Sequence, residues 1–148
     1  MIRRFRKSCR LTIAIGSSEH RNERENPFSG RERKAMMEAF LRESRIGDVR
    51  VVVLRDGPSF RWSVDNLIRK CRPDVVFLST ERSRLAELVA REVPVARFRR
   101  TGRISATRIR DSVAAGRRDW ERLTGKSVAR WIRSHDGIAR IKSTYGLP

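Results

Sequence analysis

The sequence predicts an α/β fold with a mostly parallel sheet and a helical carboxy-terminal part. Short apolar runs alternate with stretches of helical periodicity along the first two-thirds of the chain, an order typical of parallel α/β domains. The last third carries helical patterns only. A length of 148 residues with 39% hydrophobic residues suits one core, so residues 1–148 are expected to form a single domain.

Three apolar runs predict buried strands, because each is short and rich in valine, isoleucine or leucine. They cover residues 11–16, 49–54 and 74–78. A fourth strand is predicted for residues 93–98, where Pro94 indicates the beginning of the strand or a sheet edge.

Helical patterns lie before, between and after these runs. The first nine residues resemble a helix that feeds directly into the first strand. Residues 31–43 and 83–91 carry apolar residues on one face, namely Ala35, Met36, Ala39 and Phe40 in the first and Leu85, Leu88 and Val89 in the second. Three further helices are predicted at residues 107–115, 127–134 and 137–143.

The composition allows predictions about the location of the protein, the state of its cysteines and its charge. No stretch approaches the roughly 18 consecutive apolar residues of a membrane span, and the first residues lack the apolar centre of a signal peptide, so a soluble cytoplasmic protein is expected. Cys9 and Cys71 have no metal-ligand spacing and are expected to be reduced. The formal charge of +18 comes almost wholly from arginine, which indicates either an anionic partner or only a solvated basic surface.

Polar residues follow the first predicted strand, at the end where open α/β sheets bind ligands. Gly16 and Ser17 open this loop, and Ser29 with Glu32 has the spacing of a capping box for the next helix. Arg33 falls in the first turn of that helix, where a cation opposes the helix dipole and an anion nearby would compensate it. A plain surface arginine is the alternative.

A second candidate phosphate site lies in residues 103–110. Ser105 and Thr107 supply hydroxyl groups where a helix should begin, and Arg110 follows one turn later. An ordinary helix cap with scattered arginines is the alternative. No Walker loop, dinucleotide glycine fingerprint, nucleophile elbow or metal cluster is present, so no metal-binding residues are predicted.

Aromatic and histidine residues allow fewer predictions. Trp62 is expected in a loop after the second strand, where it would either stack on a planar heterocycle or close the core as a lid. Trp120 and Trp131 have apolar helical neighbours and are expected in the core. His20 and His135 have no metal spacing and are expected at the surface.

Taken in order, these segments resemble the nicotinamide-nucleotide adenylyltransferases of the archaeal type, within the Rossmann-like nucleotidyltransferases. Four segments carry the resemblance, and it is their combination that is specific: residues 15–18 (Ile-Gly-Ser-Ser), 26–33 (Asn-Pro-Phe-Ser-Gly-Arg-Glu-Arg), 104–110 (Ile-Ser-Ala-Thr-Arg-Ile-Arg) and 119–123 (Asp-Trp-Glu-Arg-Leu), followed by Val128.

The resemblance implies a Rossmann-like three-layer α/β/α fold and adenylyl transfer from ATP to nicotinamide mononucleotide, giving NAD and pyrophosphate with Mg²⁺ assisting. By matching position, Ser105, Thr107 and Arg110 would bind ATP phosphates. Arg33 would act on the phosphates at the reacting centre as the catalytic residue, while Gly16, Ser17 and Trp62 would contact the nicotinamide nucleotide. Such proteins commonly form closed oligomers, which makes a homo-oligomer an expectation here.

One departure from the family pattern stands out, because the family's His-x-Gly-His element is absent from this sequence. Residues 1–9 resemble the second half of the helix that follows that element, so a strand and the ATP loop would be missing. Either the start of the reading frame is placed too late, or the protein is a shortened form that has lost catalysis. A strand supplied by another chain is a third explanation.

Two alternatives to this function stay open. Another nucleotidyltransferase would use phosphopantetheine, flavin mononucleotide or glycerol phosphate as acceptor. A catalytically dead relative would only bind nucleotides or RNA. An RNA- or DNA-binding module would use the charge of +18 and the basic clusters at residues 97–100 and 117–118, although the interleaved exposed aromatics usual in such proteins are absent and nucleic acid is the less favoured partner.

Overall fold

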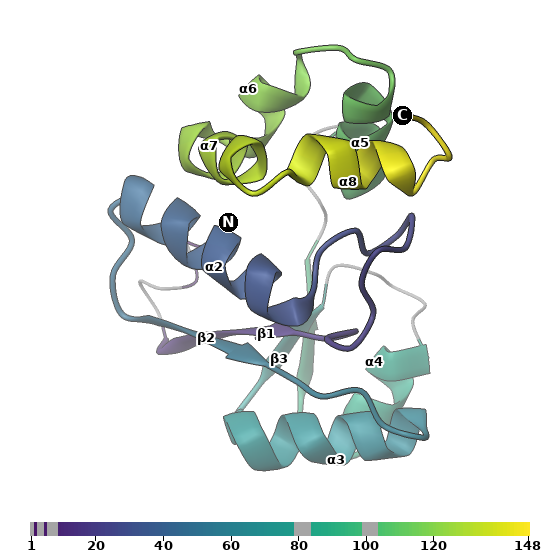
Figure 1. Ribbon diagram of the computed structural model, residues 1–148. Coiled ribbons are helices and arrows are strands. Elements are labelled where there is room, and N and C mark those ends of the chain that lie inside the picture. The colour runs from purple at the N-terminus through teal and green to yellow at the C-terminus, as the bar shows by residue number, and fades with distance from the viewer. Residues whose placement is uncertain (1, 3–4, 6–8, 79–83, 99–103) are drawn as a thin grey trace.

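The computed structural model describes residues 2, 5, 9–78, 84–98 and 104–148. Strands and helices alternate up to residue 97 and give way to helices afterwards, which confirms the α/β prediction and the helical last third. Figure 1 shows the strands β1, β2 and β3 between α2 on one side and α3 on the other, with α5 to α8 packed beyond α2. The layers are those of a Rossmann-like α/β fold.

Both strand pairs that the structure describes are parallel, in agreement with the predicted mostly parallel arrangement. β1 (Leu11–Ile15) pairs with β2 (Val49–Val53) in the register Leu11 to Val49, and β3 (Val76–Leu78) pairs with β4 (Val95–Arg97) in the register Val76 to Val95. Within the described residues the strands form two separate two-stranded sheets.

Helix α2 (Gly30–Glu43) lies between the sheet and the carboxy-terminal helices. Met37 and Leu41 pack with residues of β1 and β2, whereas Met36 packs against a second cluster built by the carboxy-terminal helices. The predicted apolar face of this helix therefore faces those helices, and a second apolar face, which the periodicity alone did not reveal, covers the strands.

Helix α3 (Phe60–Cys71) was not predicted from the sequence, where only the segment around Trp62 was expected to be a loop. The side chain of Ser59 accepts a hydrogen bond from the Trp62 N–H at 3.1 Å and so caps the helix. Val64 is fully buried, and Asn66 is buried with its amide donating to the Arg55 carbonyl at 3.2 Å. Val64 and the half-buried Leu67, Ile68 and Cys71 share one face at helical spacing.

The remaining helices follow the predictions with small shifts of boundary. They are α4 (Arg84–Val89), α5 (Ala106–Ala114), α6 (Trp120–Thr124), α7 (Lys126–Ser134) and α8 (Gly137–Ser143), of which only the five-residue α6 was not predicted. Ser83 and the side chain of Leu85, which belong to the helix predicted for residues 83–91, lie outside the described part, as do Arg99, Arg100 and Arg103.

The carboxy-terminal helices share one core. Trp120 is 3% exposed and packs with buried residues from α5, α7, α8 and the segment before α2, namely Phe28, Val113, Ala129, Ile132 and Ile141. The ring of Trp131 meets Phe28 edge-on at 5.6 Å between centroids. Trp120 therefore lies in the core as predicted, and Trp131 packs against it.

Candidate active site

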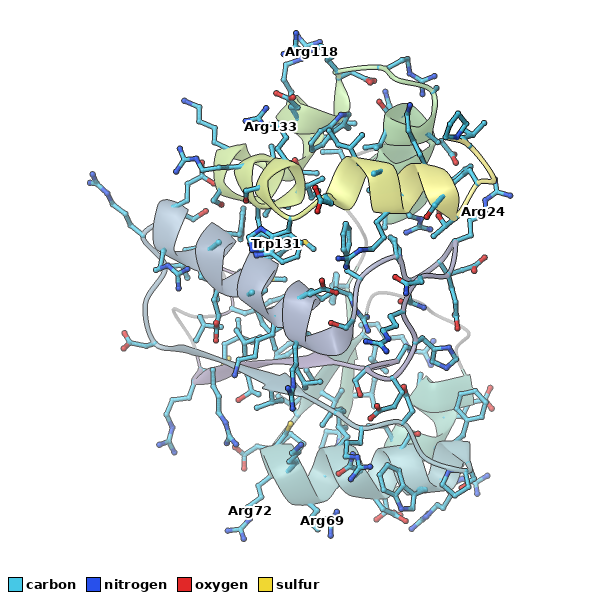
Figure 2. All side chains as sticks on the ribbon, in the orientation of Figure 1. Arg24, Arg69, Arg72, Arg118, Trp131 and Arg133 are labelled. Carbon is cyan, nitrogen blue, oxygen red and sulfur yellow. The ribbon has the colours of Figure 1, made fainter. Side chains whose placement is uncertain are left out.

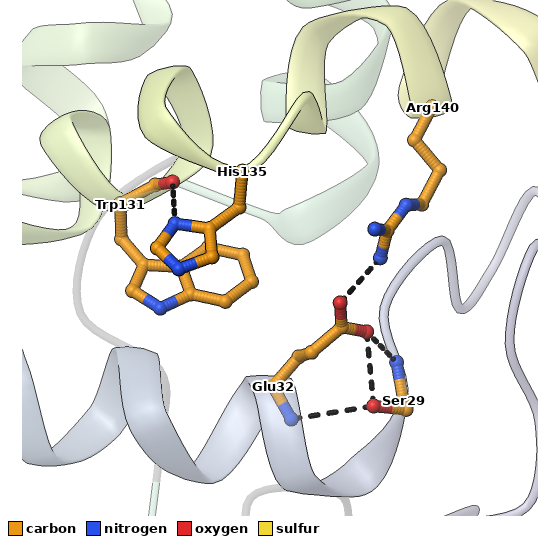
Figure 3. A network of polar contacts seen from close by, with 5 residues as sticks. All are labelled: Ser29, Glu32, Trp131, His135 and Arg140. Atoms are coloured by element: carbon orange, nitrogen blue, oxygen red, sulfur yellow. Dashed lines mark hydrogen bonds and ion pairs between the residues drawn. The ribbon is translucent and has the colours of Figure 1, made fainter.

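The candidate site is built at the carboxyl ends of β1 and β2, where the two following loops meet the start of α2. Its first fixed point is the predicted capping box, which the structure confirms (Figure 3). The Glu32 N–H donates to Ser29 Oγ at 3.3 Å, and the Ser29 N–H donates to Glu32 Oε2 at 2.8 Å. These reciprocal bonds set where the helix begins and hence where Arg33 emerges.

Glu32 has a second partner that the sequence analysis did not identify. Its other carboxylate oxygen lies 2.5 Å from Nη1 of Arg140 in α8, and both side chains are less than one-third exposed (Figure 3). Partial burial by itself would raise the pKa of Glu32, but Arg140 and the hydrogen bonds from Ser29 outweigh it and hold the pKa below its usual value.

The loop after β1 is held by the first turns of α2. The Gly30 N–H donates to the Ser18 carbonyl at 3.1 Å, and Arg33 Nη2 donates to the Ser17 carbonyl. A Cβ at residue 30 would lie 2.7 Å from Ser18 Cβ, so glycine is what permits this close approach. Gly16 and Ser17 are exposed at the top of the loop, where a ligand can reach them.

The Arg33 guanidinium lies against the loop after β1, and its Nε donor is unpaired within the described part of the chain. Its Nε is buried and has no hydrogen-bond partner among the described residues. Burial lowers the pKa of the Arg33 guanidinium, while the nearby Asp56 carboxylate raises it. A buried donor without a partner costs about 1–3 kcal/mol, so an anionic ligand at this point would be favoured.

Asp56 is a site residue that the sequence analysis missed. It lies in the loop after β2, and its Oδ2 accepts a hydrogen bond of 2.8 Å from the Glu19 N–H in the loop after β1. Asp56 therefore ties the two loops together beside Arg33. Its position directly after an apolar strand, two residues beyond Leu54, was the available signal.

Trp62 lies in the first turn of α3 and not in a loop, which corrects the prediction. Its indole packs so closely on the backbone of Gly57 that a Cβ there would meet Trp62 Cε3 at 2.0 Å. The ring is half-buried and lines a hollow of about 210 Å³ along one face of α3, together with Asp65, Asn66 and Arg69. Gly57 thus fixes the ring, and the hollow leaves part of it accessible.

The second candidate phosphate site lies at the start of α5. Ser105 is the helix cap, since its Oγ accepts from the Arg108 N–H at 3.1 Å. Arg110 Nη2 donates to Thr107 Oγ1 at 3.3 Å, and Arg110 Nε is buried without a partner among the described residues. Ser105 therefore caps the helix, and its hydroxyl hydrogen, Arg110 and the exposed Thr107 keep donors for a ligand.

The carboxy-terminal helices hold α5 against the segment that leads into α2. Tyr145 Oη donates to Asp111 Oδ1 of α5 at 2.6 Å, and the guanidinium of Arg24 lies 4.4 Å from the centre of the Tyr145 ring. Phe28 packs in the same core as Val113 of α5. No described contact joins Arg33 to Arg110 directly, so the link between the two phosphate sites is this shared packing.

The two histidines are exposed, as predicted. His20 Nδ1 lies 3.0 Å from Glu23 Oε1, and the hydrogen bond with this carboxylate raises the pKa of His20. His135 stacks on Trp131 with ring centroids 4.1 Å apart (Figure 3). Neither of these contacts is a hydrogen bond to Arg33.

Described arginines lie at both ends of the molecule. Figure 2 shows Arg118 and Arg133 at one end of the molecule and Arg69 and Arg72 at the opposite end. A hollow of about 390 Å³ lies apart from the candidate site, between α2 and α7, and includes Arg42 and Arg130. This spread does not favour a single basic surface for nucleic acid.

The described residues provide neither a metal cluster nor a membrane-spanning helix. They contain no group of three or more His, Cys, Asp or Glu side chains placed to hold a metal ion. Among them there is also no helix with the length and apolar character needed to cross a membrane.

Comparison with known proteins identifies relatives of one name. The chain is 33% identical to a nicotinamide-nucleotide adenylyltransferase of Thermococcus kodakarensis over 144 residues, covering 93% of this chain and 75% of the relative. The protein of the same name from Thermococcus onnurineus is 33% identical, with 93% and 75% covered, and that from Methanosarcina mazei is 32% identical, with 90% and 77% covered. No protein-family profile matches the chain.

These relatives cover most of the chain, and three-quarters of their own length is matched. The alternation of parallel strands and helices agrees with the resemblance found in the sequence. The chain therefore belongs to the nicotinamide-nucleotide adenylyltransferase family.

Proposed function

We propose that the chain belongs to NAD biosynthesis and transfers the adenylyl group of ATP to nicotinamide mononucleotide. The relatives bear the name of this activity. The observation that supports it most directly is the pair of buried guanidinium Nε donors, on Arg33 and Arg110, that have no partner among the described residues. Both residues are ones that the family resemblance assigns to phosphates.

The reaction needs charge neutralisation and positioning rather than a covalent enzyme intermediate. A phosphate oxygen of the mononucleotide attacks the α-phosphorus of ATP, the bond from the α-phosphorus to the bridging oxygen breaks, and pyrophosphate leaves. Arginine donors placed beside the phosphates would stabilise the charge that develops. Mg²⁺ would bind phosphate oxygens of ATP and withdraw charge from the leaving pyrophosphate.

The proposed roles follow from the positions of the side chains. Arg33, held by the Ser17 carbonyl, would present its buried Nε to the phosphates at the reacting centre. Arg110 and Thr107, with the hydroxyl hydrogen of Ser105, would bind ATP phosphates at the start of α5. Trp62 would stack on the nicotinamide ring, and exposed Gly16 would let the nucleotide approach the backbone of the first loop.

The first experiment is a calorimetric titration of the folded chain with nicotinamide mononucleotide and, separately, with ATP and Mg²⁺. Arg33→Met removes charge-assisted hydrogen bonds worth about 1.5–3 kcal/mol, so nucleotide affinity should fall roughly 10- to 100-fold. Arg118→Met removes the same charge at an exposed position away from the site and is the matched control.

Equal affinities of the Arg33→Met and Arg118→Met proteins would remove Arg33 from the site. Trp62→Ala tests the stacking role in the same way, with far-UV circular dichroism to verify that α3 still forms. Tight binding of phosphopantetheine, flavin mononucleotide or glycerol phosphate in place of the mononucleotide would overturn the proposed acceptor. A cytoplasmic location and a homo-oligomer stay predictions of the family resemblance.

A further inference from the structure

Arg140 of α8 forms an ion pair with Glu32 in the first turn of α2, across 108 residues of chain (Figure 3). Its guanidinium carbon also lies 5.5 Å from the centre of the Phe28 ring. Both charged side chains are less than one-third exposed, so solvent and salt screen this pair less than they screen a surface ion pair.

Both carboxylate oxygens of Glu32 are engaged, each by a different part of the chain. Oε1 accepts from Arg140 Nη1 at 2.5 Å, and Oε2 accepts from the N–H and the hydroxyl of Ser29 at 2.8 and 2.9 Å. A carboxylate held from two sides keeps one orientation. The cap of α2 therefore has a fixed position relative to α8.

Arg33 follows Glu32 directly and depends on the same first turn. Its N–H donates to the Ser29 carbonyl at 3.0 Å, and its Nη2 donates to the Ser17 carbonyl. Its buried Nε has no hydrogen-bond partner among the described residues. The start of α2 and the Ser17 carbonyl therefore determine where Nε lies, and a shift of the first turn would move this donor with it.

Helix α8 also packs on α5, which carries the second candidate phosphate site. Ile141, next to Arg140, is 1% exposed and belongs to the same core as Val113 of α5. Arg110 precedes Val113 by about one helical turn. Arg140 is thus fixed by packing to the element that carries Arg110, and by its charge to the turn that carries Arg33.

The charge of Arg140 has a second effect at the candidate site. Glu32 is the residue before Arg33, so without a counter-charge its carboxylate would repel a phosphate that approaches the Arg33 guanidinium. Within the described part of the chain, the Arg140 guanidinium makes no hydrogen bond to Ser17, Arg33 or Asp56. It acts on the site through Glu32.

We propose that Arg140 is a positioning residue for nucleotide binding. Through Glu32 it holds the first turn of α2, and with it Arg33, in place relative to α5, and it neutralises the carboxylate beside the phosphate. The ligand is the nucleotide phosphate of the proposed function, on which the inference rests in this respect. The positioning itself can be measured without any nucleotide.

Three variants separate this role from general stability. Arg140→Met removes the charge and keeps a long apolar side chain beside Phe28, whereas Arg140→Lys keeps a cation for Glu32. Ser127→Ala is the matched control, because it removes the 2.7 Å hydroxyl hydrogen bond from α7 to Glu43 at the other end of α2. It weakens the docking of the carboxy-terminal helices on α2 without changing the first turn.

The first measurement is amide hydrogen exchange by NMR in the 148-residue chain without nucleotide. The reporters are the first-turn amides of Gly30 and Glu32, whose N–H groups donate to the Ser18 carbonyl and to Ser29 Oγ. The amide of Leu41, a buried residue near the end of the same helix, is the internal reference.

The first-turn amides should exchange roughly 3- to 30-fold faster, relative to the reference amide, in the Arg140→Met protein. The Arg140→Lys protein should stay close to the parent chain. The Ser127→Ala protein should show no such change at these two amides, even if its Tm falls as far as that of Arg140→Met.

The second measurement is calorimetric titration with nicotinamide mononucleotide. Arg140→Met should weaken binding roughly 3- to 30-fold, Arg140→Lys should restore most of the affinity, and Ser127→Ala should bind as the parent chain does. Because Arg140 acts through Glu32, adding Arg140→Met to a Glu32→Gln protein should lower the affinity no further.

Equal changes of exchange and affinity in Arg140→Met and Ser127→Ala would overturn the inference, because Arg140 would then only dock the last helices. A further loss of affinity when Arg140→Met is added to Glu32→Gln would also overturn it, since Arg140 would not act through Glu32. If the amides respond as expected but the parent chain does not bind the mononucleotide, the positioning of Arg33 is supported and the proposed function is overturned.

Discussion

Substitution of Gly30 tests how the start of α2 positions the candidate site. An alanine Cβ at residue 30 would lie 2.7 Å from Ser18 Cβ, 2.8 Å from Val53 Cγ1 and 2.9 Å from Ser18 Cα. One of these contacts is with backbone, so the Ser18 loop must move. That movement would lengthen the Gly30 N–H to Ser18 carbonyl bond of 3.1 Å and displace the Ser17 carbonyl from Arg33.

The expected loss of unfolding free energy in the Gly30→Ala protein follows from two opposing effects. Overpacking costs roughly 1–3 kcal/mol, and the higher helix propensity of alanine recovers up to about 1 kcal/mol. The Gly30→Ala protein should therefore lose about 1–2 kcal/mol of unfolding free energy, which lowers Tm by roughly 2–8 °C at this size. Affinity for nicotinamide mononucleotide should fall with it, because Arg33 loses its anchor.

Differential scanning fluorimetry and titration of the two proteins measure both effects. Gly16→Ala is the control for stability, because a Cβ at that residue meets no atom within 4 Å. An unchanged Tm for Gly30→Ala would refute the steric reasoning, as would an equal loss of stability in the Gly16→Ala protein. A lower Tm with unchanged nucleotide affinity would mean that the Ser18 loop does not contribute to nucleotide binding.

Two further predictions concern the contacts of the carboxy-terminal helices. The pKa of Glu32 is lowered in the folded state, so its contribution to stability is present above its unfolded pKa of about 4.3 and is lost as pH falls through the lower folded value. Urea unfolding at pH 6 and at pH 3 should show a smaller difference between the two pH values for Glu32→Gln than for the parent chain, and equal differences would exclude this carboxylate as a source of acid sensitivity. Tyr145→Phe removes the 2.6 Å hydrogen bond to Asp111 and should cost about 1–3 kcal/mol in thermal or urea unfolding, whereas a change below about 0.5 kcal/mol would mean that solvent replaces the bond.

The sequence predicted those parts of the fold that depend on local signals. The capping box of Ser29 and Glu32 was correct because both of its hydrogen bonds join residues three apart. The strand positions were correct because each is a short apolar run between polar residues. Helix α3 was missed although Val64, Leu67, Ile68 and Cys71 have helical spacing, because its start was interpreted as a loop around Trp62.

Features that depend on distant contacts were not accessible to the same reasoning. The second apolar face of α2, with Met37 and Leu41, can be recognised only when the helix is known to lie between two layers. Asp56 gained its role by bonding to Glu19, 37 residues earlier. The roles assigned to Gly16, Ser17, Arg33, Trp62, Ser105, Thr107 and Arg110 stay predictions of the resemblance, because no ligand contact tests them.

Helix α2 is completed at both ends by residues from the last part of the chain. Glu32 in its first turn pairs with Arg140, 108 residues later, and Glu43 at its end accepts hydrogen bonds from the N–H and hydroxyl of Ser127, 84 residues later. During synthesis, α2 therefore leaves the ribosome long before these partners exist. Until the final helices dock, the helix lacks both of these partners, so their docking also completes the walls of the candidate site.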